Sequence, residues 1–201
     1  MSERRRIAGD AMPRMQRVVA ALALLGSASA AGGSTPSLVP VRLAPGVNEI
    51  ANIAGTGQNG KITLLWRENG NAWSHDLFIV EAGGSIATIN GENTITDTPH
   101  VGEDMIRSVR FARGTFRGRT TLQVLTATRT IVTSTYQPAK TKIEQFALVE
   151  NETGTGTPFE FVPVRSFVAQ RLYCNAEMAL KTEIGLPLTR SYSGAQSATG
   201  C

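Results

Sequence analysis

The stretch KITLLWRENGNAWSHDLFIVE, residues 61–81, holds the clearest local structural signal in the chain. Two runs of strand-forming residues flank Asn69-Gly70, a dipeptide typical of two-residue β-hairpin turns. With a turn of that length, the register places Trp66 opposite Trp73 on one face of the hairpin. The stretch therefore predicts two long antiparallel strands that carry both tryptophans of the chain.

The tryptophan face of this hairpin has two interpretations. The same register places His75 beside the two tryptophans, and an open face of this kind would form a platform on which sugar rings stack. A closed face would make Trp66 and Trp73 part of the core, each burying roughly 150–250 Å². The face also carries four aliphatic residues, Ile62, Leu64, Leu77 and Ile79. An exposed patch with that many apolar groups is unusual in a soluble protein, so we expect the inner wall of a sandwich.

Short strand patterns continue on both sides of the hairpin and are separated by glycine and asparagine turns. Asn90-Gly91 predicts a second hairpin, with Ile86 opposite Ile95. The segment GTGQNG, residues 55–60, matches the dinucleotide-binding fingerprint in form, but a strand pattern follows it where the fingerprint needs a helix. We therefore read residues 55–60 as a connection between strands. The remaining strand candidates are residues 38–43, 47–53, 105–112, 119–135, 143–149 and 159–164.

The periodicity changes near the carboxyl end of the chain. Apolar residues from Ser166 onward follow helical spacing, Gly185 is a suitable stop, and Pro187 follows it. We expect a C-terminal helix over residues 165–185. The whole pattern predicts a mainly β fold, a single antiparallel β-sandwich or partly closed β-barrel with one C-terminal helix, in a single domain over residues 31–201.

Residues 1–30 have the three-part pattern of a signal peptide. Arginines precede an apolar run over residues 18–25, and small residues end at Ala30. Met12 and Met15 are equally good starts for such a leader, and the alternative is an uncleaved amphipathic helix. The apolar run is too short to span a bilayer, so we expect no transmembrane segment in the mature chain. The pattern predicts export, to a periplasm or to the extracellular space.

The charge balance argues against a polyanionic partner. The chain has a formal net charge of +4, but the leader contains five arginines against Glu3 and Asp10, a net of +3. The mature chain is left with +1. Overall charge therefore makes nucleic acid an unlikely partner.

The two cysteines, Cys174 and Cys201, fit an oxidising compartment. We expect a disulfide bond between them that ties the tail, residues 186–201, back onto the helix. Such a loop adds about 3 kcal/mol by restricting the unfolded chain. The alternative is two unpaired thiols.

Catalytic signatures are absent from the sequence pattern. No serine-hydrolase motif is present, and the expected disulfide occupies the cysteines. The metal-ligand candidates lack any ligand spacing, so we predict no metal site and no cofactor. These candidates are His75, Asp76, His100, Glu103 and Asp104. A general acid and base from distant segments, such as Glu92 with Asp104, is left open.

Residues 107–119, RSVRFARGTFRGR, form the most distinctive charged segment. Phe111 and Phe116 are interleaved here with five arginines, namely Arg107, Arg110, Arg113, Arg117 and Arg119. In an exported protein such groups suit phosphorylated lipid headgroups, acidic polysaccharide or an acidic partner. The other interpretation is a solvated hairpin, because Arg107 and Arg110 lie on opposite faces of a strand.

Two functional hypotheses follow. The first is an exported, non-enzymatic β-sandwich module that binds a protein partner or a glycan of the cell envelope, or forms part of an envelope assembly. Its candidate binding residues are the five arginines with Phe116, and the pair Trp66 and Trp73. The second is a small exported hydrolase that depends on carboxylates or on a metal. The oligomeric state is not predicted by the sequence.

Overall fold

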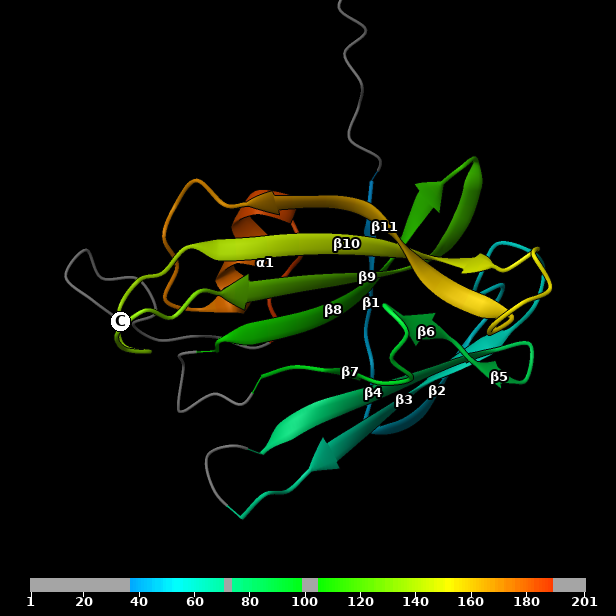
Figure 1. Ribbon diagram of the computed structural model, residues 1–201, viewed down its shortest axis with the longest axis horizontal. Helices are drawn as coiled ribbons and strands as arrows, with labels where there is room; N and C mark the ends of the chain where they lie inside the picture. Colours follow the sequence, from blue (N-terminus) through cyan, green and yellow to red (C-terminus); the bar gives the residue numbers. More distant parts are fainter. Residues whose placement is uncertain (1–36, 71–73, 99–104, 190–201) are drawn as a thin grey trace, which may run out of the picture. The chain divides into compact units, whose positions relative to one another are not determined.

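The computed structural model describes residues 37–70, 74–98 and 105–189, which are coloured in Figure 1. This part of the chain consists of strands with a single helix near its end. The elements are β1 (Val39–Val41), β2 (Gly46–Ile50), β3 (Gly60–Arg67), β4 (His75–Ala82), β5 (Ser85–Ile86), β6 (Thr88–Ile89), β7 (Ile95–Thr96), β8 (Arg107–Phe116), β9 (Arg119–Arg129), β10 (Thr141–Glu150), β11 (Phe159–Val168) and α1 (Ala176–Ile184). The leader of residues 1–30 lies outside the described residues. None of the described helical residues make a segment long and apolar enough to cross a bilayer.

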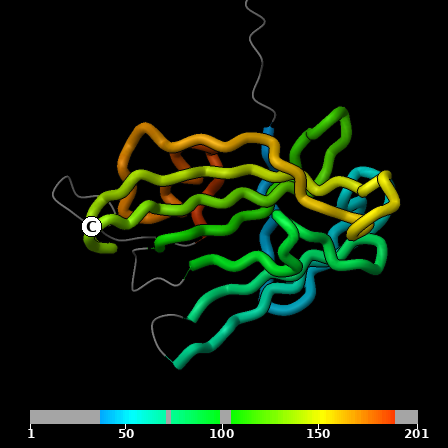
Figure 2. Tube along the Cα trace, viewed as in Figure 1, coloured from blue at the N-terminus to red at the C-terminus, as the bar shows by residue number. Residues whose placement is uncertain are grey.

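The strands form two sheets. The larger sheet has the order β1-β8-β9-β10-β11-β6, and the smaller has the order β2-β3-β4-β5, with β7 also paired to β4. All pairings are antiparallel except that of β11 with β6. Figure 2 shows the long strands β8 to β11 running side by side, with the strands of the smaller sheet beneath them. The predicted sandwich is confirmed, and both of its sheets are open.

The core between the sheets explains why they pack together. Ile62, Phe78 and Val80 of the smaller sheet belong to one buried cluster with Phe111 and Leu148 of the larger sheet. The rings of Phe78 and Phe111 have centroids 5.3 Å apart, so they join the two sheets directly. Each such buried side chain contributes about 1.5–3 kcal/mol through removal from water.

The outer faces of the two sheets differ. Helix α1 covers the larger sheet, where Ala176, Ala179 and Leu180 pack in a second buried cluster with Ala127 and Ile143. Small side chains on both partners permit this close approach. The smaller sheet has no such cover among the described residues, and its outward side chains include Val47, 61% exposed, and Leu65, 44% exposed.

The helix begins later than the sequence predicted. Residues 165–168 extend β11, which pairs with β10 from Glu150↔Phe159 to Lys142↔Val168. This ladder outweighs the local helical periodicity. Asn175 begins α1 as an N-cap whose side chain accepts from the N–H groups of Glu177 and Met178. Gly185, at φ 83°, ends it as predicted.

The hairpin over residues 61–81 forms, but in another register. Trp66 lies opposite Asp76, and Leu64 lies opposite Phe78. The strands stop at Arg67 and His75, so the predicted two-residue turn at Asn69-Gly70 is wrong. The shift is an odd number of residues, so it exchanges the faces of β4. Phe78 and Val80 face the core in place of Leu77 and Ile79.

The second predicted hairpin is half right. Ile89 and Glu92 exchange two main-chain hydrogen bonds of 2.9 Å across Asn90-Gly91, as expected for a two-residue turn. Ile95 does not pair with Ile86, however, because it pairs with Phe78 of β4. The ladder beyond the turn is thus replaced by pairing with the smaller sheet.

The glycine-rich segment of residues 55–60 connects β2 to β3 without a helix. Gly55 and Gly57 have φ values of 74° and 87°, which suit a turn. Gly60 starts β3 at a close approach, where an added Cβ would lie against the main-chain oxygen of Glu81 and 2.7 Å from Ile53 Cδ1. Close packing of strands therefore explains this glycine.

We expect Gly60→Ala to lower the free energy of unfolding by about 3 kcal/mol, because the new methyl group overlaps a carbonyl that is fixed in the β3–β4 ladder. Gly84→Ala is the control, since Gly84 has open space around it and only its φ of 79° is strained, a cost of about 1–2 kcal/mol. Denaturant unfolding of both variants gives the comparison. Equal losses would contradict the close approach at Gly60.

Candidate functional site

The five predicted arginines do not form one surface. Arg110 is 8% exposed and points toward helix α1, whereas Arg117 and Arg119 are exposed at the end of the β8–β9 hairpin. Arg113 is half-buried, and its guanidinium donates to the main-chain oxygens of Ala51 and Thr120 at 3.1 and 3.3 Å. Burial lowers the pKa of Arg113 below its usual range. The structure thus divides the segment into separate environments.

The outer end of the hairpin forms a groove. The guanidinium of Arg117 lies over the ring of Phe116, 5.0 Å from its centroid. Both residues line a space of about 460 Å³ together with Arg119, Glu150 and Glu152. Arg107 does not line it and is half-buried nearer the start of β8. Opposite charges therefore face each other across this groove, which does not present a purely basic surface.

The predicted tryptophan face is not formed by Trp66 and His75. Trp66 is 59% exposed at the end of β3, so its expected burial is wrong. His75 lies opposite Arg67, one position along, and alternation places it on the other face of the sheet. Trp73 lies outside the described residues. Trp66 instead donates from Nε1 to the Glu68 carboxylate at 3.0 Å.

Glu68 organises the connection between β3 and β4. Besides Trp66, its carboxylate accepts from the Ser74 hydroxyl at 2.7 Å and from the Gly70 N–H at 2.9 Å. The hydrogen bond from Ser74, followed by those from Trp66 and Gly70, lowers the pKa of Glu68. A charged carboxylate that accepts these hydrogen bonds ties the end of β3 to Ser74, just before β4.

The most complete candidate site is a cavity of about 410 Å³ beside strand β8. It lies where β1 has ended, and it reaches from the space between the sheets to helix α1. Its apolar lining includes Val41, Leu43, Leu64, Phe78, Val109 and Phe111. Its polar lining comprises Arg42, Asp76, Asp97, Ser108, Arg110, Glu177 and Thr189. A cavity of this size that combines apolar walls with convergent polar groups is typical of binding sites.

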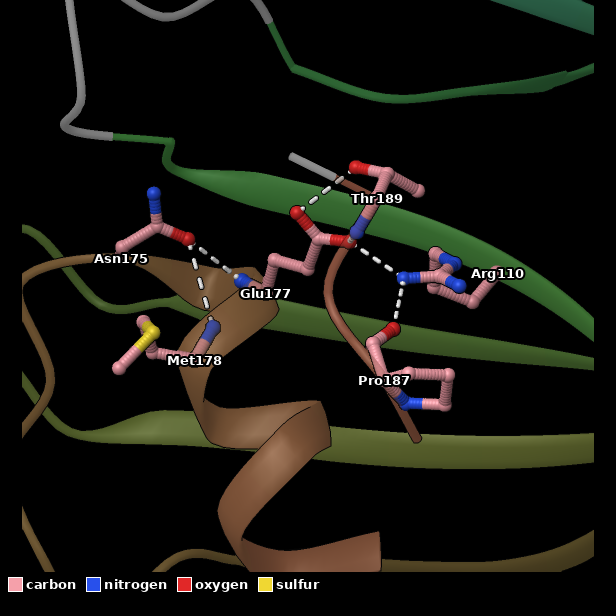
Figure 3. A network of polar contacts seen from close by, with 6 residues as sticks. All are labelled: Arg110, Asn175, Glu177, Met178, Pro187 and Thr189. Carbon is pink, nitrogen blue, oxygen red and sulfur yellow. Dashed lines mark hydrogen bonds and ion pairs between the residues drawn. The ribbon is translucent and has the colours of Figure 1, made fainter. Parts of the chain in front are cut away.

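A buried ion pair between Arg110 and Glu177 lines this cavity, and Figure 3 shows its polar contacts. Arg110 Nη1 donates to Glu177 Oε1 and to the main-chain oxygen of Pro187, the latter at 2.7 Å. Thr189 donates to the same carboxylate from its N–H at 2.7 Å and from its hydroxyl at 3.0 Å. Glu177, in the first turn of α1, is 1% exposed. The carboxylate is therefore fully supplied with donors.

Only one of the three nitrogens of the Arg110 guanidinium donates hydrogen bonds in this network. Both of its hydrogen bonds leave from Nη1. A guanidinium has five N–H donors. Those of Nη2 and Nε have no acceptor among the described residues, although the side chain is more than nine-tenths buried. These two nitrogens are not among the buried side-chain atoms that lack a hydrogen-bond partner. They therefore keep some access from outside, and Arg110 lines a cavity that has room for an acceptor.

Metal-binding clusters of three or more histidine, cysteine, aspartate or glutamate residues are absent from the described part of the chain. Of the predicted metal-ligand candidates, His100, Glu103 and Asp104 lie outside it. The Asp97 carboxylate accepts from the Asp76 N–H at 2.9 Å, which fixes the chain after β7 against β4. The cavity thus offers hydrogen-bond donors and apolar contacts.

The predicted disulfide concerns one described residue. Cys174 is buried, at 3% exposure, just before the N-cap of α1. Cys201 lies outside the described residues, as does the tail from residue 190. The pairing of the two cysteines stays a prediction.

Comparison with known proteins gives a likeness in fold. No protein-family model matches the chain, and no curated protein matches it significantly. A solved structure, "Crystal structure of CarG", aligns with a TM-score of 0.59 at 20% sequence identity. The alignment covers 72% of this chain and 95% of that chain. This likeness supports the sandwich architecture.

Sequence reasoning identified Arg110 but missed its partner and the cavity. Glu177 lies among Ala176, Ala179 and Leu180 on the buried side of α1. A carboxylate on the apolar side of a helix was the available signal, since such a group needs a cationic partner. Because that partner is 67 positions earlier in the chain, the pairing depends on the tertiary fold.

Arg110→Met is expected to lower the free energy of unfolding by about 3–5 kcal/mol, because it leaves the Glu177 carboxylate buried without its cationic partner. Arg110→Met combined with Glu177→Met removes both charges and should lose less than the single change. Arg113→Met is the control for loss of an arginine on the same strand. Urea unfolding measures all three, and a double variant weaker than Arg110→Met would contradict the pairing.

The hydrogen bond from Trp66 to Glu68 should make Trp66 fluorescence depend on acid. The folded-state pKa of Glu68 is lowered, so the ionised carboxylate stabilises the fold fully above the ordinary glutamate pKa of about 4.3. This stabilisation is lost only as the pH falls below that value toward the folded-state pKa. A titration of the Trp73→Phe protein should show a fluorescence midpoint below that value. The transition should vanish in Glu68→Gln, and a midpoint at or above the ordinary value would contradict the Glu68 network.

Proposed function

We propose that this protein is an exported, non-enzymatic β-sandwich module that holds a segment of a partner protein in the cavity beside β8. The observation that carries the proposal is the Arg110 guanidinium at the cavity wall, of which only Nη1 is hydrogen-bonded within the described part of the chain. An acceptor from a bound partner would satisfy the other two nitrogens. The leader pattern of residues 1–30 supports the exported location.

The lining of the cavity supports a protein partner over a glycan. Leu64, Phe78 and Phe111 supply apolar walls, which suit aliphatic or aromatic side chains. A sugar would bring many hydroxyl groups that need polar partners in such a place. Trp66, the aromatic residue that stands ready for stacking, does not line this cavity and has no aromatic neighbour among the described residues. A role in an envelope assembly is one form of the same protein contact.

The hydrolase alternative gains no support from the geometry of the described residues. Asp76 and Asp97 share the cavity wall, but the Asp97 carboxylate accepts a hydrogen bond from the Asp76 N–H, which gives Asp97 a structural role. Glu92 is exposed at the Asn90-Gly91 turn and does not line the cavity. Binding therefore accounts for more of the observed arrangement than hydrolysis does.

A photo-crosslinking experiment tests the proposed function. p-Benzoylphenylalanine replaces Arg42, which is exposed at the cavity rim, or Tyr136, which is 61% exposed on the β9–β10 connection. After irradiation of cells that make the protein, position 42 should give a discrete crosslinked protein and position 136 should not. The band from position 42 should weaken when Arg110→Met and Glu177→Met are added together. Equal labelling from both positions, or no band at position 42, would refute the cavity as the partner site.

A further inference from the structure

Strand β8 has a gap in its outer pairing beside the cavity. On that side β1 pairs with residues 111–113, ending at Val41↔Phe111. The next contact on the same side is the isolated bridge between Thr98 and Arg107, where the Thr98 N–H donates to the Arg107 oxygen at 3.3 Å. Among the described residues no strand covers the position between these two contacts. That position is Val109.

The main-chain groups of Val109 point into this gap. In an antiparallel sheet the N–H and C=O of alternate residues point to the same side. The Arg107 oxygen points outward to Thr98, and Phe111 pairs outward with Val41, so the Val109 N–H and C=O also point outward. Val109 lines the cavity. A donor and an acceptor in ladder geometry are thus presented to whatever occupies it.

The neighbouring groups complete a recognisable surface. Arg110 adds the unused N–H donors of its guanidinium on the helix side, and Phe111, Phe78 and Leu64 add apolar surface on the sandwich side. The main-chain donor and acceptor of Val109 match the C=O and N–H of a bound peptide group. The guanidinium donors match a second carbonyl of the same ligand, and the apolar wall matches an apolar side chain beside it.

We infer that the cavity receives a short, uncharged, apolar loop of the partner protein, whose peptide group pairs with Val109 and whose next carbonyl accepts from Arg110. This inference rests on the proposed function and specifies its ligand. The Val41 and Thr98 contacts close both ends of the gap. Only residues 107–111 separate them, about 13 Å of extended strand. The inserted segment is therefore a loop tip of a few residues that enters and leaves through the cavity mouth.

The charge around Arg110 selects an uncharged occupant. Glu177 already contacts the guanidinium and neutralises it. A carboxylate bound to Nη2 would lie close to the Glu177 carboxylate, which lines the same cavity. Like charges at such distances repel strongly in a partly buried site. A peptide carbonyl accepts the same hydrogen bonds without this repulsion.

NMR with two small probes tests the inference. N-acetyl-L-leucine N-methylamide presents two peptide groups and an apolar side chain, whereas N-acetyl-L-leucine carries a carboxylate in place of the second amide. The neutral probe should shift the Val109 amide resonance and bind at least about tenfold more tightly than the carboxylate. In the free protein the Val109 amide should exchange with solvent much faster than that of Phe111, and the neutral probe should slow it.

Two variants separate the contributions. Arg110→Met with Glu177→Met removes the guanidinium while avoiding an unpaired buried charge, and it should weaken the neutral probe about tenfold. Arg113→Met should leave its binding unchanged. A Val109 amide that is protected in the free protein, or a carboxylate probe that binds as tightly as the neutral one, would overturn the inference. A crosslink from position 42 that the neutral probe does not reduce would overturn it while leaving the proposed function in place.

Discussion

The contact between Arg110 and Glu177 fixes the carboxyl-terminal part of this protein onto the sandwich. One carboxylate joins strand β8, the first turn of α1 and the segment that reaches Thr189. A buried ion pair adds little net stability relative to well-packed apolar groups. Removing one partner is strongly destabilising, however, because the other charge stays buried without compensation. Its main effect is therefore on arrangement: α1 has a defined position over the sheet, and the wall of the cavity has a defined shape.

Strand β8 connects the two buried clusters because both of its faces are buried. Phe111 packs between the sheets, and Ala112 packs beneath the helix. A strand buried on both sides has apolar residues without clean alternation. Arg110 interrupts that pattern, and an arginine can do so only where a carboxylate and carbonyl oxygens meet its donors. The binding site that we propose occurs where this supply of acceptors is incomplete.

The sequence was sufficient for the fold class and insufficient for register. Turn dipeptides and strand composition are local signals, so the sandwich, the Asn90-Gly91 turn and the Gly185 helix stop were predictable. The register of β3 with β4 was not, because the strands end at Arg67 and His75, beyond the predicted Asn69-Gly70 turn. Residues 165–168 likewise followed their partner strand β10 against their helical spacing. The second error arose where a pairing distant in the sequence outweighed a local preference.

The candidate site was predictable only in part, for a related reason. Arg110 was singled out within an arginine-rich segment, but alternation along β8 and the different burial of its neighbours divide that segment. Glu177, Val109 and the apolar wall come together only when β1, β3, β4, β8 and α1 are assembled. A site whose residues come from these five elements leaves no motif in the sequence.

The unequal cover of the two sheets has a consequence for how the molecule opens. The larger sheet is protected by the core on one face and by α1 on the other, whereas the smaller sheet keeps Val47 and Leu65 exposed on its outer face. Local opening costs least where fewest apolar contacts are lost. We therefore expect the smaller sheet to open more readily than the larger one, on the side of the cavity lined by Leu64 and Phe78. On this expectation, the segment that we propose could enter without movement of the helix or of β8.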